Sequence, residues 1–166
     1  MQLFHGSDVI VQNPLAKVGR TKVDFGQGFY LTSLREQAES WARTIASRTR
    51  NRKPVLNTYL FDKQKAKSMI GDRYKVFATY DMEWLDYVVD SRKGGEAPYQ
   101  YDIVEGGVAN DNVIDTVEDY ENGFITAAQA LGQLVYKKVN HQMCIRSQAV
   151  IDECLKFVKA DELERG

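Results

Sequence analysis

Two short segments near the N-terminus contain the residues whose types and spacing could support chemistry. Residues 3–7 (LFHGS) place a histidine and a glycine at the end of a predicted strand. Residues 24–32 (DFGQGFYLT) place two glycines around a single residue, so the backbone there could turn tightly or be closely approached. On physical grounds alone, a packing turn is the favoured interpretation of the second segment.

Taken together, the two segments resemble the ADP-ribosyltransferase superfamily, in the branch of diphtheria toxin and the poly(ADP-ribose) polymerases. That branch carries H-G-[ST] on its first strand and F-G-x-G-[IF]-Y-[FL] later, and residues 5–7 and 25–31 match these motifs. Trp41 lies 11 residues after Tyr30, where relatives have a tyrosine that stacks on nicotinamide. The match covers the first quarter of the chain well and the rest poorly. The whole chain is most similar to a bacterial family of small, uncharacterised ADP-ribosyltransferase-like proteins.

The resemblance implies a fold and an activity. The fold would be an α+β domain with a split two-sheet β core and flanking helices, formed as one domain by residues 1–166. The activity would be the transfer of a single ADP-ribose from NAD, as substrate, to a protein or nucleic-acid acceptor. A bacterial toxin of this kind could have an antitoxin as its partner.

The resemblance also implies roles for particular residues. His5 would hold a ribose hydroxyl, Gly6 would bind the nicotinamide carboxamide through its N–H and C=O, and Ser7 could add a hydroxyl contact. Tyr30 and Trp41 could sandwich the nicotinamide ring, since aromatic stacking adds about 0.5–1.5 kcal/mol beyond area burial. Gly6→Val is then expected to block the carboxamide while leaving the fold nearly intact. The structural alternatives are a hydrogen-bonded core histidine, a core strand tyrosine and a tryptophan on a buried helix stripe.

The third motif departs from the resemblance. Relatives carry a late glutamate that binds the ribose 2′-hydroxyl and stabilises the developing cation, and its counterpart here is Gln142. The catalytic set is therefore predicted as His5, Tyr30 and Gln142. A neutral amide orients a hydroxyl but adds no negative charge, which could forfeit several kcal/mol. Glu105 or Asp111 could substitute for the missing carboxylate. Ala38 stands where some relatives use a serine to reach the carboxamide.

The chain's periodicity predicts the elements that would position these residues. Strands are expected at 2–7, 25–32, 55–61, 101–108, 141–146 and 155–158. Helices are expected from Ser33 through Ile45, at 81–91, 111–121 and 126–136, and after Ser147. Capping boxes are predicted at Ser33 and Thr126. The first helix should bury Leu34, Ala38, Trp41 and Ile45. Strands and helices that do not alternate one for one favour an α+β domain.

The basic cluster at residues 48–53 has two interpretations. It could contact the NAD pyrophosphate or a nucleic acid. The favoured interpretation is a solvated helix end, where cations complement the helix dipole.

Composition excludes several other classes of protein. The chain has 166 residues and a formal net charge of -1, which argues against binding long nucleic acid by bulk charge. Two cysteines and two histidines make a metal cluster improbable. No apolar run approaches the roughly 20 residues that cross a bilayer, and residues 1–5 do not resemble a signal peptide. The expectation is a cytoplasmic protein with reduced thiols, no metal and no membrane association.

Two further functions compete with the transferase. One is a module of the same fold that has lost catalysis with its glutamate and binds NAD or a protein. The other is an RNA 2′-phosphotransferase, whose members use a histidine and arginines where Tyr30 and Gln142 stand.

Overall fold

The computed structural model describes residues 1–109, 113–137 and 139–166. The described residues form an α+β fold with two mostly antiparallel sheets and six helices, which confirms the α+β class expected from the sequence. Asp111, one of the two substitute carboxylates considered above, lies outside the described residues.

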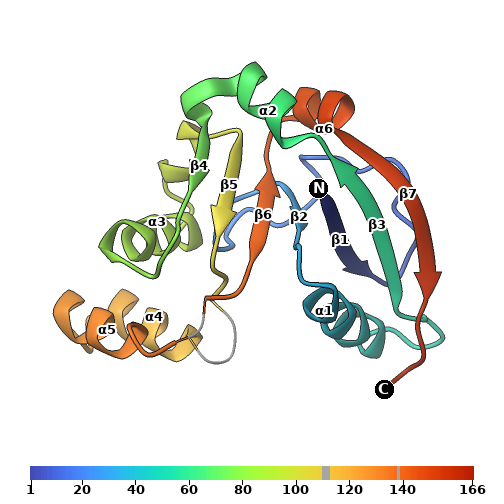
Figure 1. The fold of residues 1–166 in the computed structure, drawn as a ribbon. Coiled ribbons are helices and arrows are strands. Elements are labelled where there is room, and N and C mark those ends of the chain that lie inside the picture. Colours follow the sequence, from blue (N-terminus) through green and yellow to red (C-terminus); the bar gives the residue numbers. More distant parts are fainter. Residues whose placement is uncertain (110–112, 138) are drawn as a thin grey trace.

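The two sheets stand side by side with β1 and β2 as their facing edges (Figure 1). The first is antiparallel in the order β1-β3-β7, with β1 (Gln2–Ser7), β3 (Val55–Phe61) and β7 (Leu155–Glu162). The second has the order β2-β6-β5-β4, with β2 (Phe29–Leu31), β6 (Gln142–Ile145), β5 (Ile103–Gly106) and β4 (Tyr74–Val76). Only β4 and β5 are parallel among these pairs.

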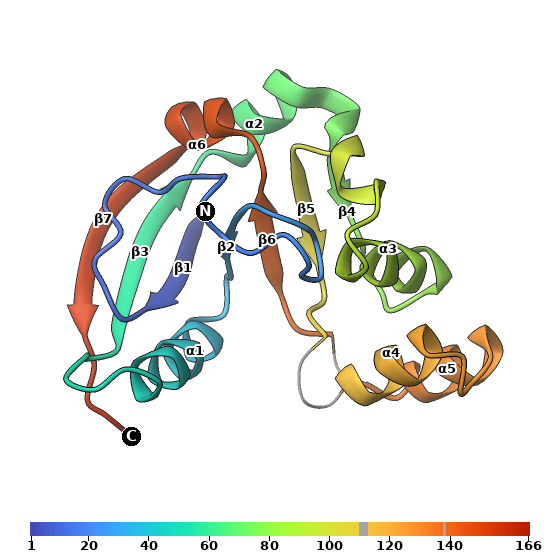
Figure 2. The same cartoon turned by 180° about the vertical axis from the view of Figure 1, so that it is seen from behind.

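The helices surround the sheets. They are α1 (Arg35–Ser47), α2 (Lys63–Ile70), α3 (Met82–Arg92), α4 (Ile114–Glu121), α5 (Ala127–Leu134) and α6 (Gln148–Cys154). Helix α1 packs on the first sheet, and the long connection between β1 and β2 crosses a face of that sheet (Figure 2).

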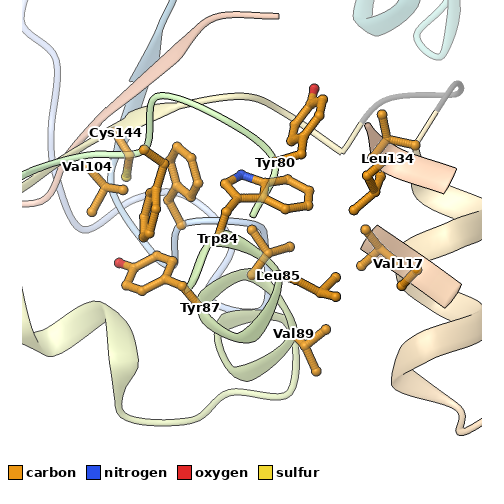
Figure 3. Close-up of a cluster of buried hydrophobic side chains, with 14 residues drawn as sticks. Tyr80, Trp84, Leu85, Tyr87, Val89, Val104, Val117, Leu134 and Cys144 are labelled. Carbon is orange, nitrogen blue, oxygen red and sulfur yellow. The ribbon is translucent and has the colours of Figure 1, made fainter. Parts of the chain in front are cut away.

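Strand β6 separates two hydrophobic clusters. Cys144 belongs to the cluster around α3, which includes Trp84 and Leu85 and extends to α4 and α5 (Figure 3). Met143 and Ile145 point the other way, into the cluster that also contains residues of both sheets. Because side chains alternate along a strand, Gln142 lies on the same face as Cys144.

Several expected helix starts are confirmed. Thr126 forms a complete capping box with Gln129, and the Ser147 side chain caps α6 by accepting from the backbone N–H of Val150. The capping box predicted at Ser33 is wrong, because α1 begins at Arg35 and has no side-chain cap.

The predicted buried face of α1 is correct at Ala38 but wrong at Leu34 and Trp41. The helix buries Ala38, Ala42 and Ala46, whereas Leu34 and Trp41 are each 44% exposed. Small residues form this face because the helix backbone lies directly against β1, as described below.

Four expected strands differ in length, and β6 is shorter than predicted by one residue at each end. Of residues 25–32 only Phe29–Leu31 are strand, β5 is shorter than predicted, and β7 runs four residues beyond Val158. Helix α2 and strand β4 were not predicted. Within the ranges that the structure covers, we find no helix with the length and apolar character required to traverse a bilayer.

Candidate functional site

The two sheets meet at a β-ladder of one residue pair. Phe4 and Thr32 exchange backbone N–H···O bonds of 2.8 and 2.9 Å. In antiparallel register the next such pair would be Gly6 with Tyr30. That pair does not form, because the Tyr30 carbonyl accepts instead from His5 Nδ1 at 2.7 Å. The ladder is therefore interrupted where β1 and β2 separate.

We call the interruption of the ladder beyond the Phe4–Thr32 pair the opening, and Gly6 has two backbone groups on its β1 side. The backbone groups of alternate residues in a strand point to the same side, and Phe4 directs its own toward β2. Gly6 N–H and C=O therefore also point away from β3, and no hydrogen bond of either group occurs among the described residues. A donor and an acceptor side by side on one strand edge match the acceptor and donor of a carboxamide.

The opposite side of Gly6 is in contact with α1. A Cβ at this position would overlap the Ala38 carbonyl oxygen and lie 2.8 Å from the Ala42 nitrogen. The expectation that Gly6→Val leaves the fold nearly intact is therefore wrong. Ala38, which replaces the serine of some relatives, lies at this helix–strand contact.

His5 has one ring nitrogen bonded and one available. A carbonyl only accepts, so Nδ1 carries the hydrogen that bonds Tyr30 O, and Nε2 is left as an acceptor. Burial lowers the pKa of His5, although the hydrogen bond to Tyr30 acts in the opposite direction. The ring also packs against Phe29, with 4.5 Å between centroids. A neutral His5 can thus accept a hydrogen bond from a hydroxyl group.

The hydroxyl groups of Ser7 and Tyr30 already have local partners. Ser7 is buried, and its Oγ accepts from the Val9 N–H at 3.3 Å. The Tyr30 hydroxyl donates to the Gly26 carbonyl at 2.6 Å and accepts from the Phe25 N–H at 3.1 Å. Burial raises the pKa of Tyr30 well above its ordinary value. Tyr30 therefore holds the glycine turn, which supports the packing interpretation of this segment and leaves only the ring for a ligand.

Trp41 is not part of a buried helix stripe. Trp41 is the residue before Ala42, whose backbone lies against Gly6. The Trp41 side chain is 44% exposed. The Arg48 guanidinium lies 5.5 Å from its ring centroid. An exposed indole on the helix that contacts Gly6 is suitable for stacking on a flat ring.

Gln142 is buried, with 7% of its surface exposed, and its Nε2 has no hydrogen-bond partner in the described part of the chain. It lies on β6, the neighbour of β2, so Tyr30 and Gln142 are on paired strands. A buried amide without a partner carries a free-energy cost and marks a place where a ligand could bind.

Asp24 is a site residue that the sequence interpretation missed. Its carboxylate accepts from the Ala109 N–H at 2.8 Å and from Arg92 at 3.3 Å, and Asp24 is 8% exposed. Burial raises the pKa of Asp24, while Ala109, Arg92 and the amide of Gln142 act to lower it. Within the part of the chain that the structure describes, Asp24 is thus a carboxylate close to Gln142. The only sequence signal was its place directly before Phe25-Gly26.

Glu105 is held in a separate polar cluster. Its oxygens accept from His141 Nε2 at 2.9 Å, from the Tyr74 hydroxyl at 2.8 Å and from Lys63 at 3.1 Å. His141 Nδ1 accepts from the Ser33 N–H, so this cluster joins β5 to the start of α1. The contacts of Glu105 are therefore with groups of the protein itself, which argues against its acting as the substitute for the missing glutamate.

We expect Glu105→Gln to destabilise the protein by about 3 kcal/mol at neutral pH. Burial alone would raise the pKa of Glu105, but the three donors outweigh it and lower the pKa to about 2. A depressed pKa contributes stability above the unfolded value, and this stability is lost as pH falls toward 2. Urea unfolding between pH 2 and 7 measures how the free energy of unfolding depends on pH. In Glu105→Gln, the part of this dependence that comes from Glu105 should be absent.

The control is Glu162→Gln, which removes only an exposed ion pair with Lys53 and should lower the free energy of unfolding by less than about 1 kcal/mol. If the two variants lost the same amount of stability, the conclusion that Glu105 is strongly stabilised by its three donors would be incorrect.

The basic cluster at residues 48–53 is partly paired. Lys53 contacts Glu162 at 2.8 Å, Arg52 lies 3.9 Å from Asp8, and Arg48 covers Trp41. These contacts agree with the solvated helix end that the sequence favoured.

A broad, open depression of about 1010 Å³ lies elsewhere, beside α6 and the end of β3. Its lining includes Met1, Asp62 and Asp152 but none of the predicted site residues.

The described residues thus define a two-sheet α+β protein whose sheets separate at an interrupted ladder lined by polar groups. By sequence the chain belongs to the family described as protein of unknown function (DUF3990), whose family model matches residues 1–157. Searches of curated proteins and of solved structures gave no match.

Proposed function

We propose that this protein is an NAD-dependent mono-ADP-ribosyltransferase with an ADP-ribosyltransferase-like core. The observation that carries the proposal is the interrupted ladder between β1 and β2, which leaves the Gly6 N–H and C=O facing the opening. A nicotinamide carboxamide offers the complementary acceptor and donor. The motifs in residues 5–7 and 25–31 that resemble this superfamily are the residues that form the interruption.

In the proposed complex the nicotinamide ring lies between Gly6 and the exposed indole of Trp41. His5 Nε2 accepts from a ribose hydroxyl, and Gln142 Oε1 accepts from another. The bond between C1′ of the ribose and the nicotinamide nitrogen breaks, and its electron pair leaves with neutral nicotinamide. An acceptor group on a macromolecule attacks C1′ and releases its proton to solvent. The charge on the ribose ring is the feature that Gln142, as a neutral group, stabilises poorly.

A catalytically weakened NAD-binding module of the same fold is the second candidate. The specific observation in its favour is that Gln142, buried on β6 two residues before the Tyr30 partner Cys144, carries a neutral amide. The two candidates share NAD binding and differ in nicotinamide release. Calorimetry with NAD together with chromatographic detection of nicotinamide separates them. A folded protein that bound no NAD would exclude both.

Trp41→Ala is expected to weaken NAD binding by about 5–10-fold while leaving stability nearly unchanged. The indole is exposed, so its loss removes a stacking surface for the ligand and little internal packing. Calorimetric titration with NAD measures the affinity, and thermal unfolding measures the stability. Val158→Ala removes a similarly exposed apolar side chain on β7 and should leave the affinity unchanged. Equal affinities for wild type and Trp41→Ala would place the nicotinamide elsewhere.

A further inference from the structure

We propose that Asp24 is the positioning residue for Gln142: its carboxylate attracts the Gln142 Nε2 group and thereby turns Oε1 toward the opening. This inference rests on the proposed function and names the residue that orients the amide. Asp24 acts through Gln142 and does not itself contact the nucleotide.

The backbone brings Asp24 to this position from two directions. The glycine turn lies over β6, with the Cys144 Sγ 3.8 Å from the Gly26 carbonyl. Asp24 precedes this turn by two residues. On the other side, β5 ends at Gly106, which is paired with Gln142, and the chain then offers the Ala109 N–H to Asp24 at 2.8 Å. The carboxylate is therefore fixed at the end of β5, on the side of β6 to which Gln142 points.

The hydrogen-bond pattern leaves Gln142 dependent on Asp24 for its orientation. The two ends of an amide are chemically opposite, and their assignment follows from the neighbouring groups. Among the described residues Nε2 makes no hydrogen bond of ordinary geometry, and the amide lies close enough to the Asp24 carboxylate to lower its pKa. A negative charge favours the N–H end, so Oε1 is directed away from Asp24. An acceptor in that direction is what a ribose hydroxyl requires.

The charge of Asp24 is only partly balanced. Arg92 is its cation, but Arg92 also contacts Glu118 at 3.3 Å and Glu121 at 3.7 Å, both on α4. Among residues 1–109, 113–137 and 139–166, the other titratable groups that interact with Asp24 are the hydroxyls of Tyr30 and Tyr80. One guanidinium shared by three carboxylates leaves net negative charge at this site, which also favours a cation developing on the ribose.

The test compares Asp24→Asn with Arg92→Gln. Both variants break the same ion pair, but only the first removes the carboxylate. Asp24→Asn is expected to slow nicotinamide release at saturating NAD by about tenfold, with NAD affinity nearly unchanged. Arg92→Gln should retain release within about threefold. If Asp24 has only a structural role, the rate of nicotinamide release will fall by the same factor in both variants, and this result would overturn the inference.

The pH profile gives a second distinction. Asp24 must be ionised to attract Nε2, so wild-type release should fall as the pH drops through the pKa of Asp24. Arg92→Gln removes a nearby cation, which raises the pKa of Asp24, so its fall should begin at a higher pH. Asp24→Asn should show no such fall. A wild-type profile that Asp24→Asn leaves unchanged would overturn the inference.

A measurement without NAD keeps the inference separate from the proposed function. The side-chain amide signals of Gln142, assigned by their loss in Gln142→Ala, should shift in a ¹⁵N NMR titration as Asp24 ionises. The shift should be absent in Asp24→Asn and present in Arg92→Gln. Gln142 signals that do not respond to Asp24 would refute the positioning role, whether or not the protein binds NAD. Failure of NAD binding with an intact NMR response would refute only the proposed function.

Discussion

Gly6→Ala is expected to lower the free energy of unfolding by about 3 kcal/mol. The added Cβ would overlap the Ala38 carbonyl oxygen and press on the Ala42 nitrogen, and both are backbone atoms of α1. Backbone atoms cannot rotate away as a flexible side chain can, so the helix must move off β1. Urea denaturation measures the loss.

Gly132→Ala is the matched control for Gly6→Ala. Gly132 lies within α5, and a Cβ there would meet nothing within 4 Å. Because glycine in a helix is less favourable than alanine, this control should stabilise the protein by about 0.5–1 kcal/mol. If Gly6→Ala were as stable as wild type, the close approach of α1 to β1 would be incorrect.

This contact affects how the proposed site can be tested. Position 6 must meet two conditions: it must have no Cβ on the side facing α1, and its N–H and C=O must remain unpaired at the opening. A substitution at Gly6 therefore changes the fold before it changes ligand binding. Trp41 is the better position for testing NAD affinity, because its side chain is exposed and carries little internal packing.

Elements with strong local signals were predictable from the sequence. Residues 2–7 and 55–61 form strands with the predicted bounds, and Thr126 and Ser147 cap helices as expected. In each case the information lies within a few residues of chain. A capping side chain bonds to backbone N–H groups two or three residues after it, so distant contacts have little influence on where the helix begins.

Elements that depend on distant partners were not predictable. The buried face of α1 is set by Gly6, a residue in another element, so periodicity of the large apolar residues identified the wrong face. Helix α2 buries only Ala66, and β4 contains three residues, so neither has a hydrophobic pattern to detect.

The candidate site was predictable in its residue types but not in its contacts. The sequence singled out His5, Tyr30 and Gln142, and two of these meet through a bond from a side chain to a backbone carbonyl. No pattern of residue types encodes such a bond. Asp24 was missed because an acid before a glycine turn usually lies in solvent, whereas here Ala109 and Arg92 hold it inside.

Gln142→Glu is expected to raise nicotinamide release by about 10–100-fold at neutral to alkaline pH. The substitution keeps the side-chain length, removes an amide N–H group without a partner, and adds a negative charge beside the developing ribose cation. Release measured over time in the absence of an acceptor reports this intrinsic rate. Gln64→Glu adds the same charge on the exposed surface of α2 and should leave the rate unchanged.

The size of this increase should depend on pH because Asp24 lies beside the new carboxylate. Two close carboxylates resist simultaneous ionisation, which raises at least one of their pKa values. The increase should therefore appear only as the pH rises, and the variant should be less stable than wild type. Combining Gln142→Glu with Asp24→Asn removes the repulsion, so the faster release should extend to lower pH. A rate unchanged by Gln142→Glu in both backgrounds would show that this position does not face the reacting ribose, and the protein would then be better explained as a binding module.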